Sequence, residues 1–120
     1  KSGRRAMSHL SILPTVLRDE TLLAAALEEL QLPVHWGGEL RGFADDRQPV
    51  ILRTQLPQGL WLGWSRQADG SLALVGDLQR LGRSHSPQQL IGRITRCYAT
   101  LHALRQAGEQ LAGAAIHLQA

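Results

Sequence analysis

The sequence predicts a small α+β protein, a single antiparallel-rich sheet with two helices packed on one face, in the order β-α-β-β-β-β-α-β. Three observations lead to this prediction. Two segments, one near each end, place apolar residues three or four positions apart, as amphipathic helices do. Between them, from Val34 to Gly76, the apolar residues follow period two, which is typical of strands. The 120 residues are 43% hydrophobic and 19% charged, an ordinary composition for one folded domain.

The first part of the chain predicts a strand followed by a helix. Polar and apolar residues alternate over Ser8–Leu13, which predicts a short strand. Asp19 then precedes a helical apolar pattern and is expected to be the N-cap, while Glu20 suits the positive first turn. Pro33 ends this helix. Its apolar stripe consists of Leu22, Leu23, Ala26, Leu27 and Leu30.

Four strands are predicted in the middle of the chain. They are expected at Val34–Phe43, Pro49–Gln55, Leu60–Arg66 and Leu72–Val75. Gly37-Gly38 interrupts the first of them and is expected to form a bulge. Asp69-Gly70 separates the last two, and this dipeptide between alternating apolar segments predicts a hairpin with a tight turn.

A second helix is predicted after a polar, irregular segment at residues 77–85. Ser86 at the N-cap, Pro87 at the first helical position and Gln89 completing a capping box mark its start. Its apolar stripe consists of Leu90, Ile91, Ile94, Cys97, Tyr98, Leu101 and Leu104. We expect this helix to end at Gly108 or at Gly113.

The end of the chain is expected to add one strand at Ala114–Leu118, with Ile116 and Leu118 buried. No internal repeat and no linker separates these elements, so residues 7–120 are predicted to form a single α+β domain. Residues 1–6 are expected to be an added or unstructured extension, because Met7 has the character of a natural start.

The net charge gives little support to a nucleic-acid partner. The whole sequence has a formal net charge of +3, from 13 basic and 10 acidic residues. Lys1, Arg4 and Arg5 all lie in the predicted extension, so the remaining chain carries ten arginines against ten acids. A neutral domain has no long-range field that would attract a polyanion.

No catalytic, cofactor or metal pattern is present in the sequence. A single cysteine, Cys97, excludes an internal disulfide and is expected to be a small buried apolar residue. No pair of histidines has the His-x-x-x-His spacing of a helical metal site, and no glycine-rich phosphate loop occurs. Ser8 and His9 are adjacent on a strand and therefore point to opposite faces. No apolar segment approaches the roughly 20 residues that span a bilayer. We therefore predict no catalytic residue, no cofactor and no metal.

Two tryptophans suggest one candidate surface. Trp61 and Trp64 have opposite parity on one predicted strand, so both cannot face the same core. One of them is expected on the outer sheet face, where it either contacts a partner or is covered by a loop or by the first strand.

Four arginines suggest a second candidate surface. Arg80 and Arg83 precede the second helix, and Arg93 and Arg96 lie along it. They form either a solvated polar face or a contact for an anion such as RNA, phosphate or an acidic protein. A sheet with an outward aromatic and flanking arginines is loosely similar to an RNA-binding platform, although no ribonucleoprotein motif is present.

Four short motifs occur in a fixed order along the chain: Met7–Ile12, Arg41-Gly42-Phe43, the hairpin from Leu62-Gly63-Trp64 to Asp69-Gly70, and Thr95–Ala99. Taken together, they resemble the hypothetical chloroplast reading frame 35 proteins of cyanobacteria and red-algal plastids. The chain departs from that family at Asp77-Leu78-Gln79, where paired tryptophans usually follow the aspartate. The family-motif positions are His9, Arg41, Gly42, Phe43, Asp77 and Tyr98. The resemblance implies lineage and compartment, namely a cyanobacterial cytoplasm or a plastid stroma, and no defined activity.

Together these observations predict a non-enzymatic accessory or adaptor protein of photosynthetic cells that acts through protein–protein contact. The expected partner is a protein, which includes a second copy of the chain, and not a membrane. The predicted interaction surface consists of Trp61, Trp64, Arg80, Arg83, Arg93 and Arg96. Two alternatives stay open, an RNA- or anion-binding protein and an enzyme of unrecognised class.

Overall fold

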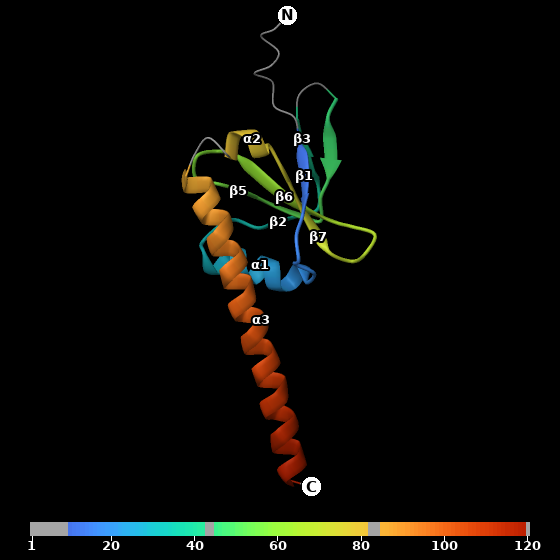
Figure 1. Ribbon diagram of the computed structural model, residues 1–120, viewed down its shortest axis with the longest axis vertical. Coiled ribbons are helices and arrows are strands. Elements are labelled where there is room, and N and C mark those ends of the chain that lie inside the picture. The colour runs from blue at the N-terminus through green and yellow to red at the C-terminus, as the bar shows by residue number, and fades with distance from the viewer. Residues whose placement is uncertain (1–9, 43–44, 82–84, 120) are drawn as a thin grey trace, which may run out of the picture.

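The computed structural model describes residues 10–42, 45–81 and 85–119, with the side chains of 85–87 and 112–119 outside the description. A five-stranded sheet lies between a layer of helices and a small two-stranded sheet (Figure 1). In chain order the elements are β1 (Ser11–Pro14), α1 (Glu20–Glu29), β2 (His35–Trp36), β3 (Glu39–Arg41), β4 (Arg47–Pro49), β5 (Leu52–Gln55), β6 (Trp61–Arg66), β7 (Leu72–Gly76), α2 (Leu78–Leu81) and α3 (His85–Gln119).

The predicted α+β class is confirmed, whereas the number and order of the elements differ from the prediction. The large sheet has the order β1-β7-β6-β5-β2, and all its neighbours are antiparallel. Both long helices cover one face of this sheet, because their stripes join the inward residues of β5, β6 and β7 in one core. The fully buried members of this core include Leu23, Leu27, Leu52, Leu62 and Leu72.

The N-cap predicted for the first helix is confirmed. One carboxylate oxygen of Asp19 accepts hydrogen bonds from the backbone N–H groups of Thr21 and Leu22, at 2.9 and 3.1 Å. The other oxygen accepts one from the guanidinium of Arg105 on α3, at 2.6 Å. The hydrogen bond from the Thr21 hydroxyl, followed by that from Arg105, lowers the pKa of Asp19 well below its usual range.

Replacing Asp19 with alanine is expected to lower the free energy of unfolding by about 1 kcal/mol at pH 7, the usual value of an N-cap. Because the folded-state pKa of Asp19 is depressed, its contribution is complete above the unfolded pKa, near 4, and is lost as the pH falls toward the folded value. Urea unfolding at pH 7, 4 and 2.5 measures the free energy of unfolding of both proteins. The difference between wild type and Asp19→Ala is expected to become smaller as the pH falls. The control Asp45→Ala changes an exposed residue, and a pH-independent Asp19→Ala difference would contradict the assignment.

Strands β2 to β5 form one bent hairpin, where the sequence predicted two strands, the first interrupted by a bulge at Gly37-Gly38. Pairs in both sheets keep a common register, from His35 opposite Arg53 to Arg41 opposite Arg47. The bend occurs at Gly37-Gly38, where both residues have positive φ, a conformation that glycine adopts without strain. A hydrogen bond from the Val50 N–H to the Gly38 carbonyl, at 3.0 Å, continues the ladder through the bend. The tip of the hairpin therefore folds over the outer face of the large sheet.

The hairpin predicted around Asp69-Gly70 is confirmed as β6 and β7. Arg66 pairs with Leu72, and the Gln67 N–H donates to the Ser71 carbonyl at 2.8 Å. The connection is therefore a three-residue loop with Gly70 at positive φ, one of the common hairpin forms.

The alternation along β6 assigns its two tryptophans to opposite faces. Trp64 is only 3% exposed and belongs to the core beneath the helices. Trp61 is half-buried on the outer face, where it packs beside Leu40, Val50 and Val75. The sheet is thus covered on both sides, and Trp61 is the outward tryptophan that the sequence predicted without identifying.

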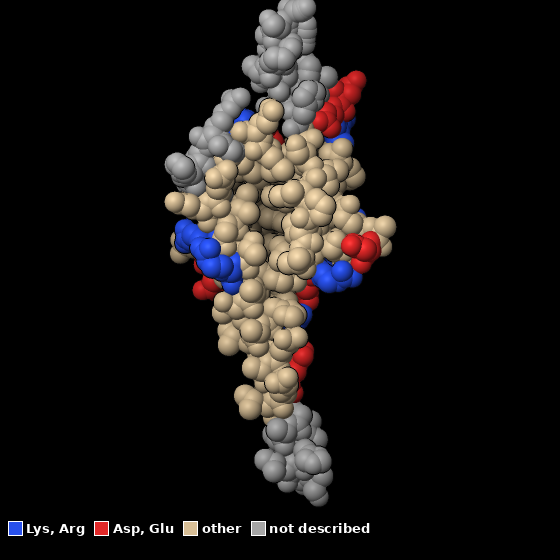
Figure 2. Space-filling model, viewed as in Figure 1, with Lys and Arg blue, Asp and Glu red and all other residues tan. Residues whose placement is uncertain are grey.

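The C-terminal part of the chain differs most from the prediction. Ala114–Leu118, predicted as a strand, is the last part of helix α3, because the alanine-rich sequence strongly favours helix. Residues 78–81, predicted to be irregular, form the short helix α2. Leu104, predicted to be in the core, is 62% exposed. Helix α3 continues past α1 and projects from the body, which gives the molecule extents of 73 × 29 × 20 Å (Figures 1 and 2).

Candidate interaction site

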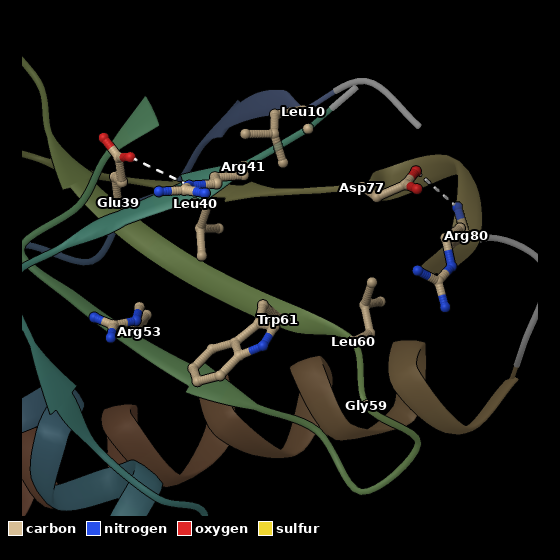
Figure 3. A pocket seen from close by; sticks show the side chains of 11 residues that line it. Leu10, Glu39, Leu40, Arg41, Arg53, Gly59, Leu60, Trp61, Asp77 and Arg80 are labelled. Atoms are coloured by element: carbon tan, nitrogen blue, oxygen red, sulfur yellow. Dashed lines mark hydrogen bonds and ion pairs between the residues drawn. The ribbon is translucent and has the colours of Figure 1, made fainter. Parts of the chain in front are cut away.

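A cavity of about 330 Å³ lies on the outer face of the large sheet, beneath the tip of the bent hairpin. Five parts of the chain border it: the segment before β1, the β3 strand, β5, the start of β6, and the junction of β7 with α2 (Figure 3). Its lining residues are Leu10, Glu39, Leu40, Arg41, Gly42, Arg53, Gly59, Leu60, Trp61, Asp77 and Arg80. Five of them were selected from the sequence, namely Arg41, Gly42, Trp61, Asp77 and Arg80.

One part of the wall of this cavity is apolar, and the rest is formed by charged side chains and glycine backbone. Leu10 and Leu40 line it from the side of the hairpin, and Leu60 and Trp61 line it from the opposite side (Figure 3). Leu40 and Leu60 are buried, whereas Trp61 is half-buried. An apolar side chain that enters the cavity would therefore leave water on several sides at once.

The indole ring of Trp61 is held in place by its neighbours. The guanidinium of Arg53 lies 5.3 Å from the ring centroid, a cation–π distance. The same guanidinium donates to the carbonyl of Gly37 at 2.8 Å, which fixes it at the bend of the hairpin. The ring of His35 lies 5.5 Å from the indole ring in a tilted arrangement. A restrained aromatic side chain loses little further freedom when it meets a partner.

The charged residues around the cavity are partly neutralised by one another. Glu39 forms ion pairs with Arg41 and Arg47, at 3.5 and 3.7 Å. Arg53 is occupied by Gly37 and Trp61. Arg80 is exposed and forms no ion pair with the described residues. Among the described lining residues, Arg80 is therefore the cation whose guanidinium has no partner, and it is available to an anionic group.

Asp77 positions Arg80. Asp77 is only 5% exposed, and one of its carboxylate oxygens accepts a hydrogen bond from the backbone N–H of Arg80 at 3.2 Å. The Asp77 carbonyl accepts a second one from the Leu81 N–H, also at 3.2 Å. The other carboxylate oxygen is buried and has no hydrogen-bond partner among the described residues. This family-motif aspartate thus caps α2 and places Arg80 at the end of the cavity (Figure 3).

Tyr98, another family-motif position, lies on the opposite side of the sheet from the cavity. Its hydroxyl accepts hydrogen bonds from the backbone N–H groups of Arg18 and Asp19, at 3.2 and 3.0 Å. Its ring is parallel to that of His102, with centroids 6.3 Å apart, so the two rings are stacked. Tyr98 therefore joins α3 to the start of α1.

The remaining predicted positions do not belong to the cavity. Trp64 is in the core, and Arg93 and Arg96 are exposed on α3. Arg83, His9, Phe43 and the predicted extension at 1–6 lie outside the described residues. Arg53 and the three leucines of the walls were missed from the sequence. The β5–β6 pairing brings Arg53 to Trp61, and the bend of the hairpin brings Leu40 there, neither of which residue spacing alone reveals.

Comparison with known proteins places the chain in a family. The model of a protein family of unknown function, DUF1257, matches residues 26–117, well over half of the chain. The chain belongs to this family. No curated protein and no solved structure matches the chain. The DUF1257 match includes the entire bent hairpin, β6, β7, α2 and most of α3, and thus all of the cavity lining except Leu10.

Two further findings on this DUF1257 member concern other kinds of site. Among the described residues, no group of three or more histidine, cysteine, aspartate or glutamate side chains is arranged to hold a metal ion. No helix in the described parts of the chain is both long and apolar enough to cross a membrane.

Proposed function

We propose that this protein is a non-enzymatic accessory or adaptor protein that acts through protein–protein contact at the cavity beside Trp61. One observation supports this proposal above all. Five positions that the sequence singled out, in three segments of the chain, border the same cavity: Arg41 and Gly42, Trp61, and Asp77 and Arg80. Tryptophan and arginine beside an apolar recess are the residue types that dominate binding energy at protein interfaces.

The chemistry of the lining favours contact over catalysis. Among the described residues that line the cavity there is no serine, threonine, cysteine or histidine, the usual nucleophiles and proton carriers of active sites. The carboxylate of Glu39 is held in ion pairs, and Asp77 is occupied in capping α2. Arg41 and Tyr98, two family-motif positions, lie on opposite sides of the sheet and do not form a common site.

The lineage of the protein is part of the proposal. The ordered motifs shared with the chloroplast reading frame 35 proteins support a role in photosynthetic cells, in a cyanobacterial cytoplasm or a plastid stroma. A partner is therefore to be sought among the proteins of those compartments.

Affinity purification from the native organism tests the proposal. A tagged wild-type chain is expected to retain a partner, and the double variant Trp61→Ala/Arg80→Glu is expected to lose most of it, because the aromatic anchor and the free cation are both removed. The matched double variant Arg93→Glu/Arg96→Glu introduces more negative charge on α3, away from the cavity, and is expected to retain the partner. Recovery of wild type alone at native abundance, or loss of the partner only in the α3 variant, would refute the proposal.

An anion- or RNA-binding role is the second candidate. Arg80, Arg93 and Arg96 are exposed and form no ion pair with the described residues, which leaves three cations for phosphates. On the face shown in Figure 2, however, the basic side chains lie in separate groups at the margins and form no continuous patch. Retention of RNA that weakens with salt and disappears in Arg93→Glu/Arg96→Glu would favour this candidate.

A further inference from the structure

We infer that the cavity binds a peptide segment with a large apolar side chain and a carboxylate next to it, such as the C-terminal residue of a partner. This inference rests on the proposed function and specifies the chemistry of the partner. The apolar side chain would occupy the space between Leu40, Leu60 and Trp61. The carboxylate would accept hydrogen bonds from the guanidinium of Arg80.

The size of the cavity suits such a segment. A volume of about 330 Å³ is at the lower end of the roughly 300–1,000 Å³ found for small-molecule pockets. A cavity of this size admits a residue or two and not a folded surface. Its apolar part, formed by Leu40, Leu60 and the ring of Trp61, offers no hydrogen-bond partner, so an apolar side chain is favoured in that part.

The charges at the cavity specify the neighbouring group. Glu39 is paired with two arginines, and Arg53 is fixed against Trp61 and Gly37. A cationic ligand would therefore meet Arg80 without a free carboxylate to compensate it, because the unpaired oxygen of Asp77 is buried. A carboxylate ligand meets a guanidinium whose planar N–H groups match its two oxygens.

One free guanidinium favours a carboxylate over a phosphate chain. Nucleic-acid sites combine several cations along a groove, so that successive phosphates are neutralised together. Around this cavity the other arginines are occupied by Glu39, Gly37 or Trp61. A peptide carboxylate needs only the single cation that Arg80 supplies.

Two small probes isolate the two parts of the inference. N-acetyl-L-leucine carries the apolar side chain and the carboxylate, and N-acetyl-L-leucinamide has the same shape without the charge. Each is titrated into the ¹⁵N-labelled 120-residue chain, and binding is followed by amide and indole chemical shifts. The acid is expected to shift the signals of Gly42, Leu60, Trp61 and Arg80, and the amide to shift the same signals with about fivefold weaker affinity, the ratio of one partly exposed ion pair.

Variants then assign the difference to Arg80. In Arg80→Gln the two probes are expected to bind equally, whereas the control Arg93→Gln keeps the fivefold ratio. Arg80 is exposed on a four-residue helix, so its replacement leaves the core unchanged. Absence of shifts with the acid, or an unchanged ratio in Arg80→Gln, overturns the inference. Tighter binding of uridine 5′-monophosphate or inorganic phosphate to the same residues also overturns it, in favour of an anion site.

The result is separable from that of the partner purification. If the acid probe does not bind but Trp61→Ala/Arg80→Glu still loses a protein partner, the inferred chemistry is wrong and the proposed function stands. If the probe binds as expected but no protein partner depends on Trp61, the cavity is a ligand site and the adaptor function is wrong.

Discussion

Replacing Gly63 with valine is expected to lower the free energy of unfolding by about 2–3 kcal/mol. Gly63 lies on the outer face of β6, directly beneath the bent hairpin. A Cβ atom at this position would lie 2.6 Å from Cγ1 of Val50 and 3.1 Å from Cδ1 of Leu40. Valine adds two further methyl groups, so the hairpin tip would have to move away from the sheet.

Urea unfolding measures this loss, and a second substitution tests its cause. In the double variant Gly63→Val/Val50→Ala, the smaller alanine side chain leaves space for the new valine. The double variant is therefore expected to lose less free energy of unfolding than the sum of the two single variants. The control Gly108→Ala adds a Cβ that meets nothing within 4 Å, in the projecting part of α3, and is expected to be neutral or slightly stabilising. A Gly63→Val loss below 0.5 kcal/mol, in the range of an ordinary surface substitution, would contradict the packing of the hairpin on the sheet.

Replacing Tyr98 with phenylalanine is expected to lower the free energy of unfolding by about 1–3 kcal/mol. The hydroxyl of Tyr98 is the acceptor for the backbone N–H groups of Arg18 and Asp19. Phenylalanine keeps the ring in the core but leaves both donors without this acceptor at the start of α1. A partly buried N–H group that is left without an acceptor lowers the stability by more than the net contribution of an ordinary hydrogen bond.

The same unfolding experiment tests Tyr98, with faster amide exchange expected at Arg18 and Asp19. The control Thr95→Val removes a hydroxyl on the same helix whose hydrogen bond, to the Ile91 carbonyl, is exposed and within the helix. Its loss is expected to be below about 0.5 kcal/mol, as for most surface substitutions. Equal losses for the two variants would show that the Tyr98 hydroxyl does not join α1 to α3.

Local patterns predicted much of the fold because their causes are local. Asp19 caps α1 through groups two and three residues away, so the amino-acid order alone contains the signal. The dipeptide Asp69-Gly70 forms its hairpin because only the loop and its flanking strands are needed. The alternation along β6 likewise required that Trp61 and Trp64 face opposite sides.

The errors in the prediction have a common physical cause. Alternating apolar residues at 116 and 118 fit a short strand, but a strand also needs a neighbour with free backbone groups, and helix needs none. The alanines therefore decided the outcome at 114–118, where the helix continues. Leu104 continues the helical spacing of Leu101, but it lies on the part of α3 that projects beyond the packed core and is therefore exposed. A periodic apolar pattern does not reveal where along a helix the packing against the core stops.

The residue pattern alone was thus sufficient to predict an α+β protein with an N-capped first helix, a late hairpin and one outward tryptophan. The packing of both long helices on the side of Trp64 makes Trp61 the outward one. The cavity beside Trp61 depends on the bend at Gly37-Gly38, where positive φ angles turn one hairpin across the outer sheet face. Such a bend brings together residues far apart in the chain, and spacing along a sequence carries no record of which distant side chains will meet.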